Sequence, residues 1–271
     1  MKPGGTNALM DASARSPWLS VVMPALNERG NIAAAVRNTL AAFDDFGLDG
    51  EIVVIDDGSS DGTGDVVAAW MADDPRVRLV RHESPRGVGA SFWDGVANAR
   101  GEFVCMLPGD NENDPWELFR YHRLLEHVDI LIPFVFNKQA RSIFRNGLSF
   151  LYRFIINTTF VVSFNYTNGT ILYRKAILDE IAFRSSGFFF QTDILIRAVK
   201  RGYLFAEVPY RLNQRLGGVS KAVTFPSFLN VARGYLRLVK DTYFTRHDES
   251  PPFDAGSQTA KRYAGSSPCR R

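Results

Sequence analysis

Short apolar runs alternate with helix-like segments along the first half of the chain, and this alternation restricts the fold more than any other feature. The run EIVVI, Glu51–Ile55, is apolar after its first residue, as is typical of a parallel strand buried on both faces. The other strands predicted by this pattern are Leu19–Met23, Val77–Val80, Glu102–Leu107 and Asp129–Val135, and the helices are Asn31–Phe46, Gly64–Asp73, Val88–Ala99 and Pro115–Glu126. This order predicts an α/β fold with a mostly parallel sheet flanked by helices.

The second half of the chain is more aromatic, and its pattern is less regular. The elements predicted there are a helix over Arg141–Phe164, a turn and strand over Tyr166–Tyr173, a helix over Thr192–Arg201, a strand over Leu204–Val208, a basic loop over Arg211–Lys221 and an amphipathic helix over Phe225–Tyr243. The small and polar residues 1–17 and 247–271 are expected to be disordered. One domain is therefore expected over residues 18–222, followed by an amphipathic segment over residues 223–246.

Composition excludes several classes of protein. The net charge of +3 is too small to imply a nucleic acid partner. With only two cysteines, Cys105 and Cys269, a disulfide framework is not expected, and a reducing compartment fits. No apolar run reaches the roughly 18 residues that span a bilayer, and residues 1–16 contain no apolar core of a signal peptide. A cytoplasmic protein is therefore expected.

Clusters of polar residues follow three of the predicted strands. They are PALNERGN at Pro24–Asn31, DDGSSDGT at Asp56–Thr63 and PGDNE at Pro108–Glu112. Each cluster alone is explained equally well by turn chemistry. However, the carboxyl ends of parallel strands form one edge of the sheet, where ligands gather. Three such clusters at one edge therefore favour a binding site, and the acids after the fourth strand suggest a cation with a phosphate ligand.

The segments around these clusters resemble family 2 glycosyltransferases of the GT-A fold, and more narrowly the polyprenyl-phosphate glycosyltransferases, which include dolichol-phosphate mannose synthases. The resemblance is carried by VVMPALNERGNI, EIVVIDDGSSDGT, GVGASFWDGVANARGEFVCMLPGD, NGTILYRKAI and GYLFAEVPYRLNQRLGGVSK, which together cover about residues 20–221. It implies an inverting transfer of a sugar from a nucleotide-diphosphate sugar, GDP-mannose or a UDP-hexose, to a polyprenyl phosphate at the cytoplasmic face of a membrane.

The same resemblance implies which residues bind the donor. The nucleotide site would comprise Pro24, Ala25, Asn27, Glu28, Asp56, Asp57, Gly109 and Asp110. The family's metal motif is usually Asp-x-Asp with a Gln two residues later, and the matching positions here are Pro108, Asp110 and Glu112. Asp110 and Glu112 would then hold Mg²⁺ or Mn²⁺ together with phosphate oxygens and waters. The alternative is a solvated acidic turn without a metal.

Basic residues of the second half are implied to bind the acceptor phosphate. The candidates are Lys138, Arg141, Arg145 and Lys221, with Ser149 as a hydrogen-bond donor and Arg215 in a catalytic role. The spacing of Arg145 and Ser149 places both on one face of a helix. A phosphate is already an anion, so no strong general base is required. Asp193 would act as a base for a hydroxyl acceptor, or it could cap the helix that starts there.

Segment 141–164 combines large apolar side chains with arginines, a combination that suits a helix lying at a membrane surface. Phe225–Tyr243 is a second candidate, and a buried core helix explains either pattern equally well. Because no spanning helix is expected, any membrane attachment would be peripheral. Two other functions stay open: a family 2 enzyme with a hydroxyl acceptor and Asp193 as its base, and a catalytically dead nucleotide-sugar-binding module, which Pro108 suggests.

Overall fold

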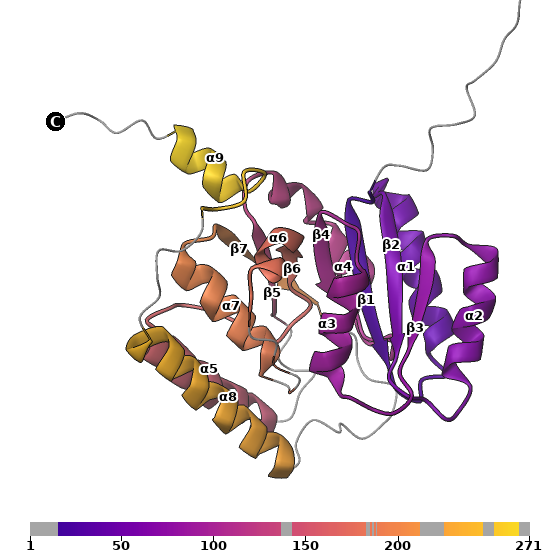
Figure 1. Cartoon of the computed structure of the whole chain (residues 1–271), viewed down its shortest axis with the longest axis horizontal. Coiled ribbons are helices and arrows are strands. Elements are labelled where there is room, and N and C mark those ends of the chain that lie inside the picture. The colour runs from indigo at the N-terminus through magenta and orange to yellow at the C-terminus, as the bar shows by residue number, and fades with distance from the viewer. Residues whose placement is uncertain are drawn as a thin grey trace, which may run out of the picture.

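A single seven-stranded sheet forms the centre of the computed structural model (Figure 1). The structure describes residues 16–136, 143–182, 185, 187, 189–211, 225–245 and 252–265. Within these ranges, the side chains of residues 143–146 and 225–229 are not described. The strands are β1 (Leu19–Ala25), β2 (Gly50–Asp56), β3 (Val77–Arg81), β4 (Phe103–Met106), β5 (Ile130–Val135), β6 (Leu172–Arg174) and β7 (Phe205–Tyr210). Their order across the sheet is β3-β2-β1-β4-β6-β5-β7. β6 is antiparallel to both of its neighbours, and every other adjacent pair is parallel.

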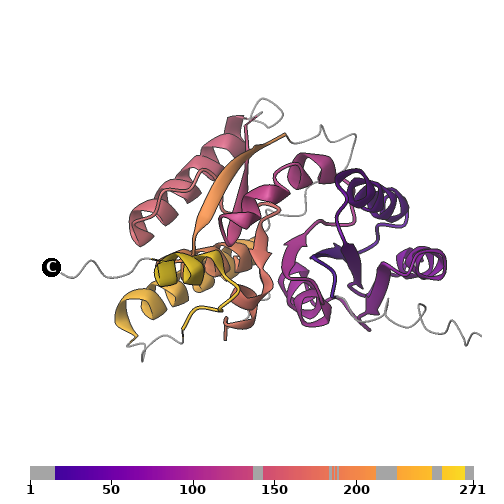
Figure 2. The ribbon, with the colours of Figure 1, turned by 90° about the horizontal axis from the view of Figure 1, so that it is seen from above.

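Helices cover both faces of this sheet. They are α1 (Ile32–Phe46), α2 (Thr63–Asp73), α3 (Val88–Asn98), α4 (Pro115–Phe119), α5 (Ile143–Phe160), α6 (Lys175–Asp179), α7 (Phe190–Arg201), α8 (Phe225–Phe244) and α9 (Gln258–Gly265). The buried side chains form two clusters, one beneath α1 and one beneath α3, and Figure 2 shows these two helices on opposite faces. The sheet therefore separates two hydrophobic cores, as its doubly buried strands predict.

The predicted elements of the first half are confirmed to within a few residues, with two differences. The predicted helix Pro115–Glu126 is divided into α4 and a 3₁₀ turn, His122–Glu126. The division follows from Tyr121, whose φ of −99° and ψ of 6° leave the α-helical region. In addition, the antiparallel strand β6 separates β4 from β5, so two strands that are successive in the sequence are not neighbours in the sheet.

The prediction of a disordered tail is wrong for residues 252–265, which pack against the sheet and include α9. Asp129, directly before β5, is fully buried and anchors this segment. Its carboxylate accepts hydrogen bonds from the backbone N–H of Gln258 at 2.7 Å and of Thr259 at 2.9 Å, and from the Thr259 hydroxyl at 2.6 Å. The Phe253 ring adds apolar contacts with the rings of Tyr203 and Tyr263.

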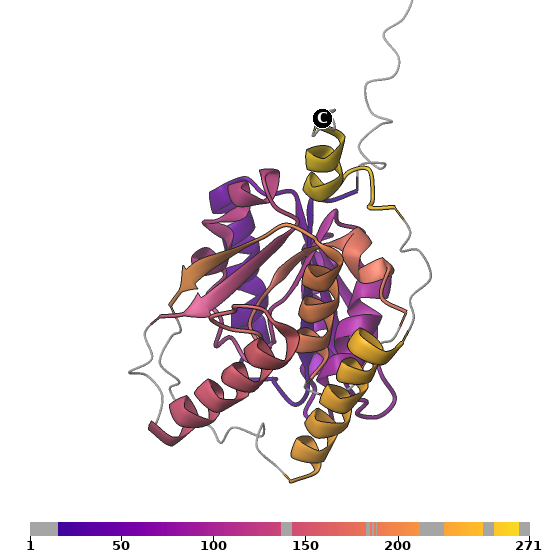
Figure 3. The ribbon, with the colours of Figure 1, turned by 90° about the vertical axis from the view of Figure 1, so that its left-hand side faces the viewer.

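Helices α5 and α8 lie at the opposite end of the sheet from α9, and Figure 3 shows them converging at one end (Figures 1 and 3). They are joined by a hydrogen bond of 2.8 Å between the hydroxyls of Thr159 and Tyr235, and Tyr243 donates to the Thr159 carbonyl at 2.5 Å. Within the described ranges, neither these helices nor any other is both long enough and apolar enough to cross a bilayer.

Candidate active site

The polar clusters that follow β1, β2 and β4 lie together at one edge of the sheet, as their positions in the sequence predict. Backbone hydrogen bonds join them: the N–H of Asp57 donates to the Ala25 carbonyl at 2.8 Å, and the N–H of Gly109 donates to the Pro24 carbonyl at 2.9 Å. β1 lies between β2 and β4 in the sheet, so its carboxyl end lies at the centre of the three loops. The predicted nucleotide-binding segments therefore form one continuous surface.

Side chains lock the first two loops against each other. Asn27, at a φ of +57°, donates its N–H to the Ser59 hydroxyl at 2.9 Å and accepts the N–H of Ser60 at 3.0 Å through its side-chain oxygen. The N–H of Glu28 donates to the Thr63 hydroxyl at 2.9 Å. These contacts are made within the chain itself and hold both loops in place, so the surface is preorganised for binding.

Asp56, at the end of β2, is 5% exposed and keeps its carboxylate close to the start of α2. One oxygen accepts the N–H of Ser59 at 3.0 Å. The other lies above Gly64, where an added Cβ would come within 2.4 Å of it and within 2.6 Å of Arg81 Nε. The absence of a side chain at Gly64 therefore allows the Asp56 carboxylate and the Arg81 guanidinium to pack against the first turn of α2.

The Asp57 carboxylate holds the loop that follows β3. It accepts the N–H groups of Arg86 at 2.8 Å and Gly87 at 2.9 Å, and His82 Nδ1 lies 2.7 Å away. Burial alone would raise the pKa of Asp57, but the hydrogen bonds from Arg86, His82 and Gly87 outweigh it and lower the pKa below its ordinary value. This carboxylate organises a loop of the site, and its contact with a nucleotide stays a prediction.

The turn after β4 carries the predicted metal ligands. Asp110 and Glu112 are half-buried, and the N–H of Glu112 donates to Asp110 Oδ1 at 3.1 Å. Asn111 between them has a φ of +58°, and its side-chain oxygen accepts from the Asn38 amide at 3.1 Å. In the described part of the chain, no three or more His, Cys, Asp or Glu side chains lie close enough together to hold a metal ion by themselves. Two carboxylates in one turn fit a metal that completes its coordination with oxygens of a ligand and water.

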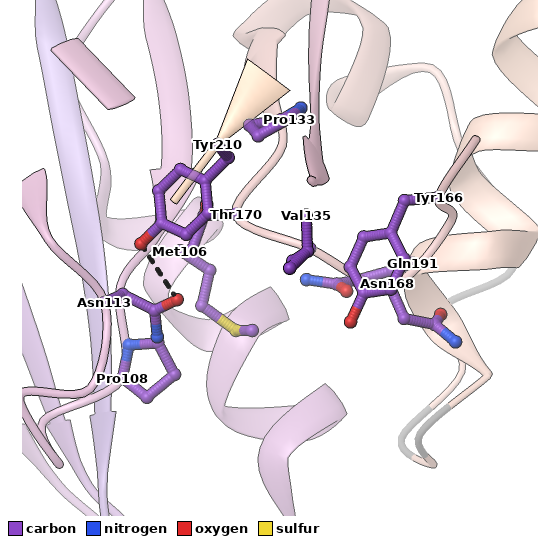
Figure 4. Close-up of a pocket in the computed structure, with 11 residues that line it drawn as sticks. Met106, Pro108, Asn113, Pro133, Val135, Tyr166, Asn168, Thr170, Gln191 and Tyr210 are labelled. Atoms are coloured by element: carbon purple, nitrogen blue, oxygen red, sulfur yellow. Dashed lines mark hydrogen bonds between the residues drawn. The ribbon is translucent and has the colours of Figure 1, made fainter. Parts of the chain in front are cut away.

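A pocket of about 110 Å³ opens beside this turn (Figure 4). It is lined by Met106, Pro108, Asn113, Pro133, Val135, Tyr166, Asn168, Gly169, Thr170, Gln191 and Tyr210. These residues come from the end of β4 and the turn that follows it, from β5 and the end of β7, from the segment before β6 and from the start of α7. Figure 4 shows Pro108 and Asn113 across the pocket from Tyr166 and Asn168, so Pro108 stands in the wall that faces the cavity.

Asp193 does not line this pocket, although Gln191 two residues earlier does. Its carboxylate is 3% exposed and accepts from Arg197 Nε at 3.0 Å, and Arg197 also pairs with Asp241 of α8 at 2.6 Å. Burial raises the pKa of Asp193, and the hydrogen bond from Arg197 opposes that rise. The suggested capping role is wrong, because the residue before the helix is Phe189 and no side chain caps it. The structure thus shows Asp193 paired with Arg197, and Arg197 links α7 to α8.

Most of the predicted acceptor-phosphate residues cannot be placed. Lys138, Arg141, Arg215 and Lys221 lie outside the described residues, and the side chain of Arg145 is likewise not described. Ser149 is exposed on α5. In contrast, the polar side chains that line the pocket were not identified as site residues from the sequence. The sequence does contain a signal for Asn168 and Thr170, because the segment NGT at residues 168–170 is one of the motifs that carry the family resemblance.

An apolar face is exposed along α5 and α8. On α5 it comprises Leu148, Phe150, Leu151, Phe154 and Ile155, and on α8 it comprises Leu236, Tyr243 and Phe244. Phe150 and Phe154 are 60% and 57% exposed, and Arg153 lies 5.7 Å from the centre of the Phe150 ring. Ile156 and Phe160 on the same helix are buried. The core-helix interpretation thus holds for one side of α5 only, and its other side presents apolar rings beside a cation.

Comparison with known proteins identifies a family and two kinds of relative. The model of glycosyl transferase family 2 matches residues 20–182. Polyprenol monophosphomannose synthase of Mycolicibacterium smegmatis is 31% identical over 220 residues, which cover 74% of this chain and 79% of that protein. Undecaprenyl-phosphate 4-deoxy-4-formamido-L-arabinose transferase of Pseudomonas syringae is 31% identical over 168 residues, 60% of this chain and 49% of that protein. The chain thus spans about half the length of this second relative.

Solved structures share the fold. Glucosyl-3-phosphoglycerate synthase of Mycobacterium tuberculosis, in a complex with Mn²⁺, UDP-glucose and phosphoglyceric acid, has a TM-score of 0.63 at 20% identity, with 88% of this chain and 85% of that chain covered. Mannosyl-3-phosphoglycerate synthase of Rubrobacter xylanophilus has a TM-score of 0.69 at 16% identity, with 88% and 79% covered. These neighbours are GT-A glycosyltransferases, so the predicted fold is confirmed.

Proposed function

Because the chain belongs to glycosyl transferase family 2, we propose that it transfers a sugar from a nucleotide-diphosphate sugar to a polyprenyl phosphate. The observation that carries the proposal is the meeting of three loops at the ends of β1, β2 and β4, with two carboxylates beside a pocket. The nucleotide would lie against the loops that follow β1 and β2, and its diphosphate against the turn at Gly109–Glu112. The sequence similarity to a polyprenol monophosphomannose synthase supports the choice of a lipid phosphate as acceptor.

Asp110 and Glu112 would hold Mg²⁺ or Mn²⁺ in this enzyme. The bound metal would supply positive charge that offsets the charge growing on the leaving diphosphate. The crystallisation of structural neighbours with either metal and UDP supports this assignment. Pro108 occupies the position of the family's first aspartate, but it contributes to the pocket wall, and Glu112 restores the count of two carboxylates. The pair therefore supports a working site rather than a dead module.

The bond changes follow from the acceptor's chemistry. An oxygen of the acceptor phosphate attacks the anomeric carbon from the side opposite the nucleotide, a new C–O bond forms, and the C–O bond to the diphosphate breaks. The configuration inverts, and no proton has to be removed from the acceptor. The engagement of Asp193 with Arg197 away from the pocket suits a reaction without a base at this position and disfavours the hydroxyl-acceptor alternative.

The proposal predicts a lipid-linked product. Purified protein is incubated with undecaprenyl phosphate, MnCl₂ and radiolabelled GDP-mannose or UDP-glucose, and the mixture is then extracted with chloroform and methanol. We expect label in the organic phase that depends on protein, lipid phosphate and metal, and that is lost with EDTA. Label in a water-soluble product would favour the hydroxyl-acceptor enzyme. Donor binding without any product would favour the dead module.

The apolar face on α5 and α8 predicts peripheral binding at the cytoplasmic surface of a membrane, where a polyprenyl phosphate would be presented. We expect the protein to float with anionic liposomes, with partial release at about 1 M salt, where the Debye length falls to about 3 Å. Replacement of both Phe150 and Phe154 by serine should abolish flotation, because their exposed rings would enter the lipid. Replacement of the exposed Met71 on α2, far from this face, serves as a control. Equal recovery of the wild type with and without liposomes would contradict the prediction.

A further inference from the structure

The described residues that line the pocket beside Pro108 are all uncharged. Among its lining residues, the polar side chains are three amides, two phenols and one hydroxyl: Asn113, Asn168, Gln191, Tyr166, Tyr210 and Thr170. None of these described side chains is a cation of the kind that normally pairs with a phosphate. Amides and hydroxyls instead offer the mixed donors and acceptors that recognise sugar hydroxyls. On this chemistry the pocket suits an uncharged sugar ring next to the diphosphate turn.

A chain of hydroxyl groups connects this pocket to α5. The Thr192 hydroxyl donates to the side-chain oxygen of Asn168 at 2.9 Å, and the Tyr152 hydroxyl lies 2.8 Å from the Thr192 oxygen. Because Thr192 uses its one proton toward Asn168, Tyr152 must donate to Thr192. Burial raises the pKa of Tyr152 to about 12, although hydrogen bonding with Thr192 and Asn168 opposes the rise, so its hydroxyl keeps this proton at neutral pH. The chain therefore has a fixed direction, from Tyr152 through Thr192 to Asn168.

This direction determines what Asn168 can offer a ligand. Its side-chain oxygen is occupied by Thr192, which leaves the amide N–H₂ as the group available in the pocket wall. Asn168 is exposed, so this amide is within reach of a ligand. Thr192 is fully buried and Tyr152 packs against the hydrophobic core, so their surroundings hold both supports in place.

We propose that Tyr152 and Thr192 are positioning residues for the sugar, because they hold the Asn168 amide so that its N–H₂ donates to a hydroxyl of an uncharged hexose. The proposal rests on the proposed transferase function and adds the residues that recognise the donor's sugar. Tyr152 and Thr192 do not touch the ligand, and they act through Asn168. The nucleotide and diphosphate lie outside this chain of hydrogen bonds, so their binding does not depend on it.

The chain offers a matched control for Tyr152. Tyr235 of α8 makes a hydrogen bond of the same length, 2.8 Å, to the hydroxyl of Thr159 on α5. Neither partner of that bond lines the pocket. Tyr152→Phe and Tyr235→Phe therefore each remove one phenolic hydroxyl from a contact between α5 and a neighbouring helix. Only the first removal should alter the presentation of Asn168.

The test compares two affinities in each variant. Binding of GDP-mannose and of GDP, or of UDP-glucose and of UDP, is measured by calorimetry with MnCl₂ present. We expect Tyr152→Phe, Thr192→Val and Asn168→Asp to weaken nucleotide-sugar binding about 10-fold, as for the loss of one hydrogen bond to a polar ligand. The affinity for GDP or UDP without a sugar should not change. Thr192→Ser keeps the hydroxyl and should restore binding. Tyr235→Phe should bind like the wild type.

The outcomes separate this inference from the proposed function. If the wild type transfers sugar while Tyr152→Phe and Tyr235→Phe bind the nucleotide sugar equally well, the positioning role is wrong and the transferase function stands. The same conclusion follows if Thr192→Val weakens the binding of GDP or UDP as much as that of the nucleotide sugars, because that result indicates a general structural role. If the wild type neither binds nor transfers from either donor, the proposed function fails, and the inference fails with it.

Discussion

Asp110→Asn is expected to lower sugar transfer by about 100-fold to 1000-fold, the range found when one group that stabilises developing charge is removed. The substitution keeps the shape of the side chain but removes its negative charge. Its amide oxygen can still accept the N–H of Glu112, so the turn after β4 should keep its conformation. The loss should therefore appear in activity and metal affinity, with little change in stability. Initial rates measured over a series of MnCl₂ concentrations provide the check.

Two other acids serve as comparisons. Glu112→Gln should be milder, because it changes Glu112 to the residue usual in the family, and it should mainly raise the metal concentration needed for half-maximal rate. Asp73→Asn, at an exposed position at the end of α2, should leave the rate and the metal response unchanged. A normal rate and metal response in Asp110→Asn would show that this turn does not hold the metal.

The largest expected effect on stability is that of Asp129→Asn, which should lower the free energy of unfolding by about 3 kcal/mol, as when one partner of a buried ion pair is removed. One carboxylate oxygen accepts from Arg174 and from Gln258, and the other accepts twice from Thr259. In either orientation, an asparagine amide would direct its N–H₂ at two of these donors. The buried Arg174 would also lose a partner charge.

Urea unfolding and thermal melting check this expectation, with a fall in melting temperature of roughly 10 °C. Glu102→Gln is the matched control, because Glu102 also pairs with Arg174 but is 52% exposed. Glu102→Gln should lower the free energy of unfolding by less than about 1 kcal/mol, as is usual for the loss of an exposed ion pair. Asp129 lies at the edge of the sheet opposite the pocket, so the folded Asp129→Asn protein should keep its transfer rate at low temperature. An unchanged melting temperature would contradict the anchoring role of Asp129.

Local patterns in the sequence predicted the half of the fold that carries the proposed nucleotide site. The apolar runs of β1, β2 and β4 are each followed directly by polar residues, and parallel strands bring such residues to one edge. The position of Asp110 and Glu112 in a single turn after β4 could therefore be predicted from spacing alone. The preorganisation of the first loops could not, since it depends on contacts such as that of Asn27 with Ser59 across two strands.

The remaining features depend on residues that are distant in the sequence. β6 is only three residues long, and its pairing with β4 and β5 is set by the packing of the second half rather than by its own pattern. The segment around α9 is polar and was assigned to a disordered tail, because nothing local reveals that Asp129 supplies its hydrogen-bond acceptor. The pocket likewise combines Pro108 with Asn168 and Gln191, which no single motif connects.

The short pairing of β4 with β6 has a consequence for where a ligand would be held. β1 and β2 pair through seven residues, whereas β4 and β6 pair only at Phe103 with Arg174 and at Val104 with Tyr173. Figure 2 shows the two halves of the molecule on either side of this junction. The loops that follow β1, β2 and β4 belong to one half, and Asn168 and Gln191 to the other. The pocket is lined by residues of both halves, so a ligand bound there would contact both sides of this junction.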